Sequence, residues 1–312
     1  MSLKLDLRGD FYKCVEKEVQ SLKADGFKFS SKEKDVSYIA EFYNLIERIP
    51  VPRPRKILKA KNFSCPKELQ KNLEVLENKI VKGESITNYL SKKIIDAHFS
   101  DSMLYDFGIT HLHLGKEENS KDEAFVERTG KILYCVLKDD DAYFLTIDDH
   151  GKWSDIKLIE IIKDNFPELL EKYELKGVIS LEHKITNEER EKFHKYHITP
   201  LLQLGNKVYG SLGGGVMTNG FSRRGMMNAI NQLKFIYYLE NIVLSFYEEN
   251  KESIISETGN IKDIEFHFYK LDNPLVLYDK NKEHKIDIEW NPQNINELSL
   301  NFTKCKCAKK AV

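Results

Sequence analysis

Hydrophobic residues recur every three or four positions in several stretches of the chain, which is the spacing of one helix face. One such stretch follows Pro66, a residue suited to a first helical turn, and ends near Gly83. A second helix is expected over 85–97, directly after it. A long helix is expected over 223–248, with Ser222 as its N-cap. Shorter helices are expected over 36–49, 156–166 and 187–197.

Strands are indicated by apolar–polar alternation and by β-branched and aromatic residues between polar turns. The stretch 109–114 alternates, and 131–137 and 142–147 flank a polar turn, which predicts a hairpin. A smaller hairpin is expected around Gly205 and Asn206. Three strands near the end predict a small antiparallel sheet, over 264–269, 275–278 and 285–290. The predicted fold class is α+β, with helices flanking a mainly antiparallel sheet and a small C-terminal antiparallel sheet.

Changes in composition divide the chain into four expected segments. Pro52 and Pro54 exclude a helix from the basic stretch 52–61, which therefore reads as an extended linker. The expected segments are an N-terminal helical segment with this linker (1–65), a helical pair with an antiparallel sheet (66–165), a glycine loop and long helix packed on that core (166–250), and a C-terminal sheet with a tail (251–312).

Composition excludes several classes of protein. The 312 residues include 17 Phe and 15 Tyr, too many core-forming residues for a wholly disordered chain. No apolar run approaches the ~18 residues of a membrane-spanning helix, so no membrane partner is expected. Lys and Arg number 48 against 49 Asp and Glu, which argues against a surface coated by nucleic acid but permits a local basic cleft.

The cysteines and the N-terminus indicate a cytoplasmic protein. The chain has 5 cysteines, an odd number, and none forms a CxxC pair typical of zinc or redox sites. Its first residues lack the apolar core and small-residue cleavage site of a secretion signal. We therefore expect reduced thiols and a cytoplasmic location.

The first candidate site is His111-Leu112-His113. Residues two apart on a strand face the same side, so the two imidazoles are expected to stand side by side. Such a pair suits two metal ligands or an acid–base pair, with His150 as a further candidate. The chain has no HExxH motif to support zinc. Packing or solvent exposure without chemistry remains the alternative.

The second candidate is a cationic cluster at the outer end of the hairpin. Arg128 precedes the first strand and His150 follows the second, so the two are expected to meet. An imidazole can remove the 2′-hydroxyl proton of RNA, another acid can protonate the leaving oxygen, and a guanidinium can stabilise charge on phosphorus. This chemistry needs no metal or cofactor. A plain surface charge cluster is the alternative.

At these residues the region 66–165 resembles RelE/ParE-type toxins, in which helices precede a small antiparallel sheet with an Arg-bearing strand and an apolar hairpin. In this resemblance Arg128 matches the strand arginine, Tyr134 a strand tyrosine and His150 the histidine after the hairpin. His111 and His113 have no secure counterpart. The resemblance implies a metal-independent endoribonuclease that cleaves messenger RNA, with a protein antitoxin as a possible partner.

The third candidate is the glycine loop before the long helix. Glycines let backbone N–H groups approach an anion, and a helix start with two arginines adds positive charge. The predicted phosphate-binding residues are Gly213, Gly214, Gly215, Ser222, Arg223 and Arg224. The spacing matches neither a Walker A loop nor GxGxxG. A connection to a core helix is the alternative.

Three functions follow from these candidates. The favoured one is a cytoplasmic, metal-independent endoribonuclease, a toxin or an antiviral defence effector, which acts on RNA. In it His111 or His113 is the general base, His150 the general acid, and Arg128 stabilises the transition state. The alternatives are a non-enzymatic module that binds nucleic acid or protein, and a metal-dependent hydrolase that uses His111 and His113. The sequence does not give the oligomeric state.

Overall fold

The structure is a computed structural model that describes residues 2–31, 35–116, 124–151, 154–258, 263–269, 275–279, 283–291 and 294–304. The chain forms two compact units. The terminal unit comprises Met1–Asp25, Glu33–Ile39 and Ala229–Val312, and the central unit comprises Gly26–Lys32 and Ala40–Asn228. Each unit is assembled from separate stretches of the chain, and the four consecutive segments expected from the sequence stay a prediction.

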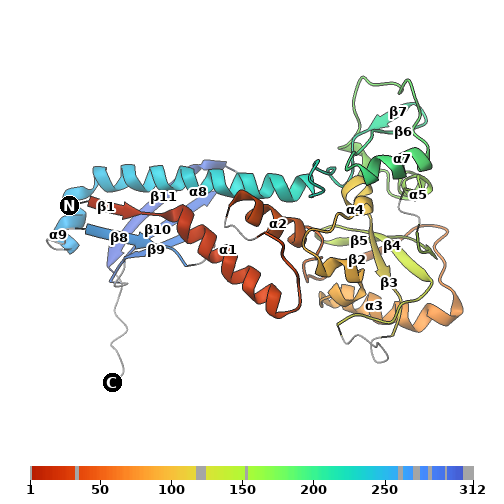
Figure 1. Cartoon of the computed structure of the whole chain (residues 1–312), viewed down its shortest axis with the longest axis horizontal. Coiled ribbons are helices and arrows are strands. Elements are labelled where there is room, and N and C mark those ends of the chain that lie inside the picture. The colour runs from red at the N-terminus through yellow and green to blue at the C-terminus, as the bar shows by residue number, and fades with distance from the viewer. Residues whose placement is uncertain are drawn as a thin grey trace. The chain divides into compact units, whose positions relative to one another are not determined.

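A four-stranded sheet in the order β2-β5-β4-β3 forms the centre of the central unit (Figure 1). Its strands are β2 (Lys56–Lys59), β3 (Thr110–His113), β4 (Lys131–Leu137) and β5 (Asp141–Asp149). The predicted hairpin is confirmed as β4 and β5, which pair antiparallel, as do β3 and β4. The basic linker supplies β2, which pairs parallel with β5 and makes the sheet mixed.

Helices and turns surround this sheet in the order of the chain. They are α3 (Gln70–Lys82), η2 (Thr87–Tyr89), η3 (Lys92–Ile95), α4 (Ser102–Phe107), α5 (Lys157–Asn165), α6 (Glu168–Glu171) and α7 (Asn187–Lys195), with the hairpin β6 (Leu202–Leu204) and β7 (Lys207–Tyr209). Before α3 lie α2 (Val36–Ile46), which spans the boundary between the two units, and η1 (Lys67–Leu69). Thr186 caps α7 in a capping box with Glu189.

The helix expected over 85–97 is wrong. Two short 3₁₀ turns, η2 and η3, take its place, because Leu90 between them has the extended dihedrals φ −73° and ψ 172°. The side chain of Ser91 accepts a hydrogen bond from the N–H of Lys93 and so starts a new turn. Buried residues at Tyr89, Leu90 and Ile94 mimic helical spacing although the backbone is not continuous.

The core of the central unit lies on one face of the sheet. Ile109, Tyr134 and Leu145 pack there against α4 and α5, which contribute Phe107 and Ile159 among others. Because alternate strand residues share a face, the row that starts at Ile109 continues through the two β3 histidines. The core therefore passes directly into the candidate site at the end of β3.

The terminal unit contains a five-stranded sheet in the order β1-β8-β9-β10-β11. The small C-terminal sheet is confirmed as β8 (Asp263–His267), β9 (Leu275–Asp279) and β10 (His284–Asn291). Two strands that the sequence analysis did not identify extend it: β1 (Ser2–Leu5), parallel to β8, and β11 (Asn294–Lys304). Its helices are α1 (Leu7–Ala24), α9 (Lys251–Thr258) and most of α8 (Arg223–Glu249), which begins in the central unit.

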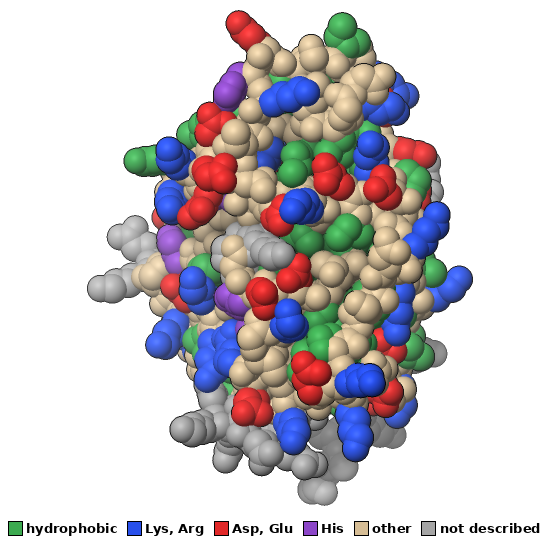
Figure 2. Space-filling view, turned by 90° about the vertical axis from the view of Figure 1, so that its right-hand side faces the viewer, with side chains coloured by type: hydrophobic (Ala, Val, Ile, Leu, Met, Phe, Trp, Pro, Cys, Tyr) green, Lys and Arg blue, Asp and Glu red, His purple; other side chains and the backbone are tan. Residues whose placement is uncertain are grey.

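Two observations concern the surface. Within the described ranges, no helix is both long enough and apolar enough to cross a bilayer. On the face drawn in Figure 2, basic and acidic side chains are interspersed, as the near-neutral total charge leads one to expect.

Candidate functional site

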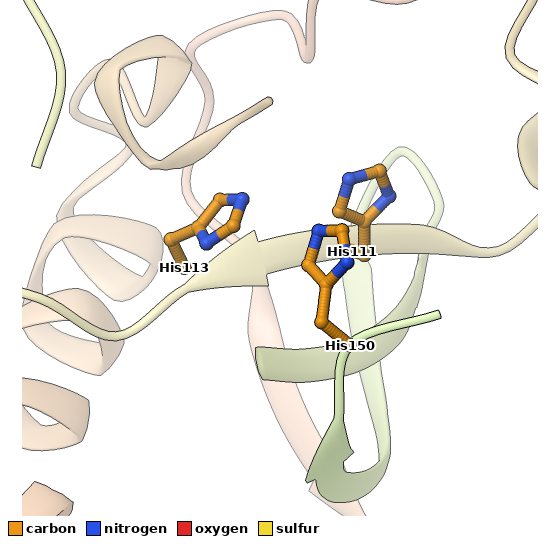
Figure 3. A group of neighbouring side chains, drawn as sticks. All are labelled: His111, His113 and His150. Atoms are coloured by element: carbon orange, nitrogen blue, oxygen red, sulfur yellow. The ribbon is translucent and has the colours of Figure 1, made fainter. Parts of the chain in front are cut away.

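Three histidine rings meet at the ends of β3 and β5 (Figure 3). His111 and His113 share a face of β3, with ring centroids 6.0 Å apart. The backbone N–H of His150 donates to the carbonyl of Gly130 (3.2 Å), which holds the turn after β5 beside the start of β4. The His150 ring thereby lies 6.1 Å from that of His111 and 5.6 Å from that of His113. One ring nitrogen from each of the three lies within 4.8 Å of the others.

Arg128 reaches this group through a loop that folds back on the end of β3. The N–H of Glu127 donates to the carbonyl of Lys116 (3.1 Å). A Cβ at Gly115 would lie 1.7 Å from the Glu127 carbonyl oxygen, so only glycine permits this close approach. The Arg128 guanidinium then contacts Nε2 of His113. The structure thus brings together four residues selected from the sequence, and their chemical role stays a prediction.

All three imidazoles are held in the neutral form. Burial lowers the pKa of His111 and lowers that of His113 to about 3, and these side chains are only 6% and 1% exposed. His150 is exposed, yet partial burial and the positive charges of Arg128 and Lys93 lower its pKa as well. Each ring therefore offers a basic nitrogen at neutral pH.

The contact with Arg128 fixes the tautomer of His113. A guanidinium can only donate, so Nε2 of the neutral ring accepts and the proton resides on Nδ1. That Nδ1 is buried and has no hydrogen-bond partner among the described residues. An unsatisfied buried donor of this kind costs about 1–3 kcal/mol. Functional sites are where such costs are commonly retained.

A cavity of about 240 Å³ opens beside two of the three rings. His111 and His150 line it, and His113 is not among the lining residues. Lys93 and Lys195 contribute positive charge, Asp101 and Glu191 contribute negative charge, and Phe99 and Met103 form an apolar part of the wall. The cavity can therefore hold a group that is partly apolar and partly anionic.

A fourth histidine, His194 of α7, lines the same cavity. Its Nε2 lies 2.8 Å from Oδ2 of Asp106, and the same oxygen accepts a hydrogen bond from Nη1 of Arg190 at 2.6 Å. Asp106 and Arg190 are both buried. Sequence reasoning missed this group, because His194 lies in an ordinary polar helix pattern and its carboxylate partner is 88 positions away.

Tyr134 does not line the cavity in the way that its predicted catalytic role requires. Its side chain is fully buried, and its hydroxyl donates to the carbonyl of Asp149 at 2.9 Å. Asp149 directly precedes His150. Tyr134 therefore fixes the end of β5, and through it the position of the exposed ring.

The glycine loop is held differently from the predicted phosphate cradle. The N–H groups of Gly213, Gly214 and Gly215 donate to backbone carbonyls at 3.1, 3.3 and 2.8 Å, so these donors are already engaged. Gly213 is required by packing, since a Cβ there would lie 1.9 Å from a carbonyl oxygen of α4. A phosphate site at this loop stays a prediction that now depends on side chains alone.

The side chains near the loop are also partly engaged. The Oγ of Ser222 accepts from the N–H of Gly225 (3.3 Å), as expected of an N-cap. Nη1 of Arg223 donates to the carbonyl of Gly214 at 3.4 Å. Nη2 of Arg224 donates to the carbonyl of Leu212 at 2.7 Å, which fixes that guanidinium beside the loop.

Comparison with known proteins adds no family: no family model, curated protein or solved structure matches the chain. The resemblance to RelE/ParE-type toxins thus stays a prediction.

The residues best placed to hold a metal ion are His111, His113 and His150, which form a three-imidazole donor set like that of some zinc enzymes. The fit is incomplete as the side chains stand. The only lone pair of neutral His113 accepts from Arg128, and a fixed guanidinium repels a dication.

Proposed function

We propose that the central unit cleaves RNA phosphodiester bonds without a metal ion. The observation that carries the proposal is the placement of a guanidinium, Arg128, on a cluster of neutral imidazoles that borders a cavity. A neutral imidazole can accept the proton of a 2′-hydroxyl, and a fixed positive charge stabilises the charge that develops on the phosphate oxygens. The same positive charge disfavours a metal ion and favours an anion.

The roles differ in part from those expected from the sequence. The lowered pKa of His150 leaves its ring neutral at pH 7, which suits a base and not the acid first expected. His150 lines the cavity and is exposed, so it accepts the 2′-hydroxyl proton, with His111 beside it. His113 is buried outside the cavity wall and orients Arg128.

His194 is better suited to be the acid. The Asp106 carboxylate at its Nε2 favours the protonated ring and leaves Nδ1 for the substrate. In the proposed reaction the 2′-oxygen forms a bond to phosphorus while the bond to the 5′-oxygen breaks. The 2′-hydroxyl proton passes to His150, and a proton from His194 passes to the leaving 5′-oxygen. The products are a 2′,3′-cyclic phosphate and a 5′-hydroxyl.

The test is cleavage of RNA in the presence of EDTA, with the products mapped at their ends. We expect cyclic phosphate ends, no cleavage where the attacking 2′-hydroxyl is replaced by hydrogen, and a loss of about 10²-fold or more in His150→Ala. His183→Ala is the matched control, since His183 is an exposed histidine paired with Glu189 outside the cavity. Intact RNA, or cleavage that survives in His150→Ala, would refute the proposal.

A metal-dependent hydrolase is the second candidate, because three ring nitrogens lie within 4.8 Å of one another. Its test is a zinc titration of the wild-type protein, paired with the cleavage assay. Tight binding together with activity that EDTA removes would favour this candidate. RNA binding without any cleavage would favour a non-enzymatic binding module.

A further inference from the structure

We propose that the central unit has a separate anion site that binds phosphate groups, in a cavity lined by Arg48, Arg55, Lys138 and Arg224. The cavity has a volume of about 250 Å³. Thr110 of β3 also lines it, whereas the next residue, His111, lines the histidine cavity. Consecutive strand residues point to opposite faces, so the two cavities lie on different sides of β3. The inference therefore stands apart from the proposed nuclease reaction.

Positive charge in this cavity exceeds negative charge. Its walls carry the four cations against two carboxylates, those of Glu47 and Asp139. Asp139 already pairs with Arg53, which does not line the cavity. Glu47 lies 3.7 Å from Nη1 of Arg224, and burial raises the pKa of its carboxyl, which weakens it as a counter-charge. An anion would complete the neutralisation of the cluster.

Two further observations indicate that the cations face an unfilled position. Burial and the positive charges of Lys172 and Arg224 lower the pKa of Lys138 to about 8, so the ammonium lies among like charges. Arg48 is only 3% exposed, and its Nη1 has no hydrogen-bond partner in the described part of the chain. Its Nε and Nη2 do donate, to the carbonyls of Asn44 and Ala97 at 3.0 and 2.9 Å. One buried guanidinium donor is thus left for a ligand.

The guanidinium groups are held in place before any ligand arrives. Nε of Arg55 donates to the carbonyl of Lys138 at 2.6 Å, and Nη2 of Arg224 donates to that of Leu212 at 2.7 Å. A preorganised set of arginines with one lysine suits phosphate, because guanidinium forks match its oxygens and lysine adds a point charge. Arg224 was also among the phosphate-binding residues expected from the sequence.

The probe for this site is pyrophosphate, titrated into the full chain by calorimetry at pH 7. We expect saturable binding that weakens about tenfold or more in Lys138→Met, which removes one charge-assisted contact. Lys138→Arg keeps the charge and should retain binding. Lys163→Met is the matched control, because Lys163 is an exposed lysine of α5 outside the cavity. Circular dichroism confirms that each variant is folded.

The source of the phosphate is resolved by a second arm. Short RNAs with a 5′-phosphate are compared with the same RNAs carrying a 5′-hydroxyl. Tighter binding of the phosphorylated form, lost in Lys138→Met, assigns the site to RNA ends, and equal binding of the two assigns it to free phosphates. The proposal is overturned if pyrophosphate fails to bind, or if Lys138→Met binds it as tightly as the wild type. Neither outcome depends on RNA cleavage.

Discussion

Acidification should destabilise the folded central unit through His113. In the folded chain burial and the Arg128 charge lower the pKa of His113 from 6.5 to about 3. The unfolded chain therefore takes up a proton at a higher pH than the folded chain, so the contribution of this group to stability is full above pH 6.5 and is lost as pH falls towards 3. At pH 5 the unfolded ring is nearly all protonated and the folded ring is not, which costs about 2 kcal/mol relative to pH 7.5.

The perturbation is His113→Gln, which keeps an acceptor for Arg128 but cannot titrate. Urea unfolding at pH 7.5 and pH 5 should show that the variant loses about 2 kcal/mol less than the wild type between the two conditions. His183→Gln, at an exposed position outside the cluster, should keep the wild-type dependence on pH. An NMR titration of the histidine Cε1 protons supplies a reading that is independent of unfolding.

Equal losses in the wild type and in His113→Gln would refute the reasoning. So would a His113 resonance that titrates near 6.5, because the ring would then be hydrated and remote from the guanidinium.

The other predictions concern packing and hydrogen bonds. Gly213→Ala should cost about 1–3 kcal/mol or more in thermal unfolding, because the new Cβ overlaps a carbonyl of α4. Asp106→Asn should cost about 3–5 kcal/mol in urea unfolding, since it leaves the buried Arg190 charge unpaired, and an unchanged midpoint would contradict this. Tyr134→Phe should cost about 1 kcal/mol and slow RNA cleavage, because the carbonyl before His150 loses its donor; cleavage at the wild-type rate would argue against a positioning role.

Local patterns were enough to predict much of the central unit. The hairpin of β4 and β5 follows from two β-rich runs around a polar turn. The shared face of His111 and His113 follows from the two-residue period of a strand, and the approach of Arg128 and His150 follows from the hairpin. In each case the information lies within a few residues of the side chains concerned.

The parts that were missed depend on distant partners or on backbone detail. β1 becomes a strand only by pairing with β8, more than two hundred residues later. The pairing of Asp106 with His194 has no local signal at all. The glycine loop resembled an anion cradle, yet its N–H groups are taken by carbonyls that only the folded chain brings near.

The guanidinium on His113 determines which kind of ligand the histidine cluster selects. At an effective dielectric constant of about 20, two unit charges about 4 Å apart repel by ~4 kcal/mol, and a dication doubles that penalty. Arg128 also engages the one lone pair that neutral His113 could give to a metal. Arg128→Met removes both obstacles and should raise zinc affinity, measured by calorimetry, while RNA cleavage in EDTA falls. If zinc binds the wild type and Arg128→Met equally tightly, the arginine does not discriminate against cations, and the metal-dependent alternative gains ground.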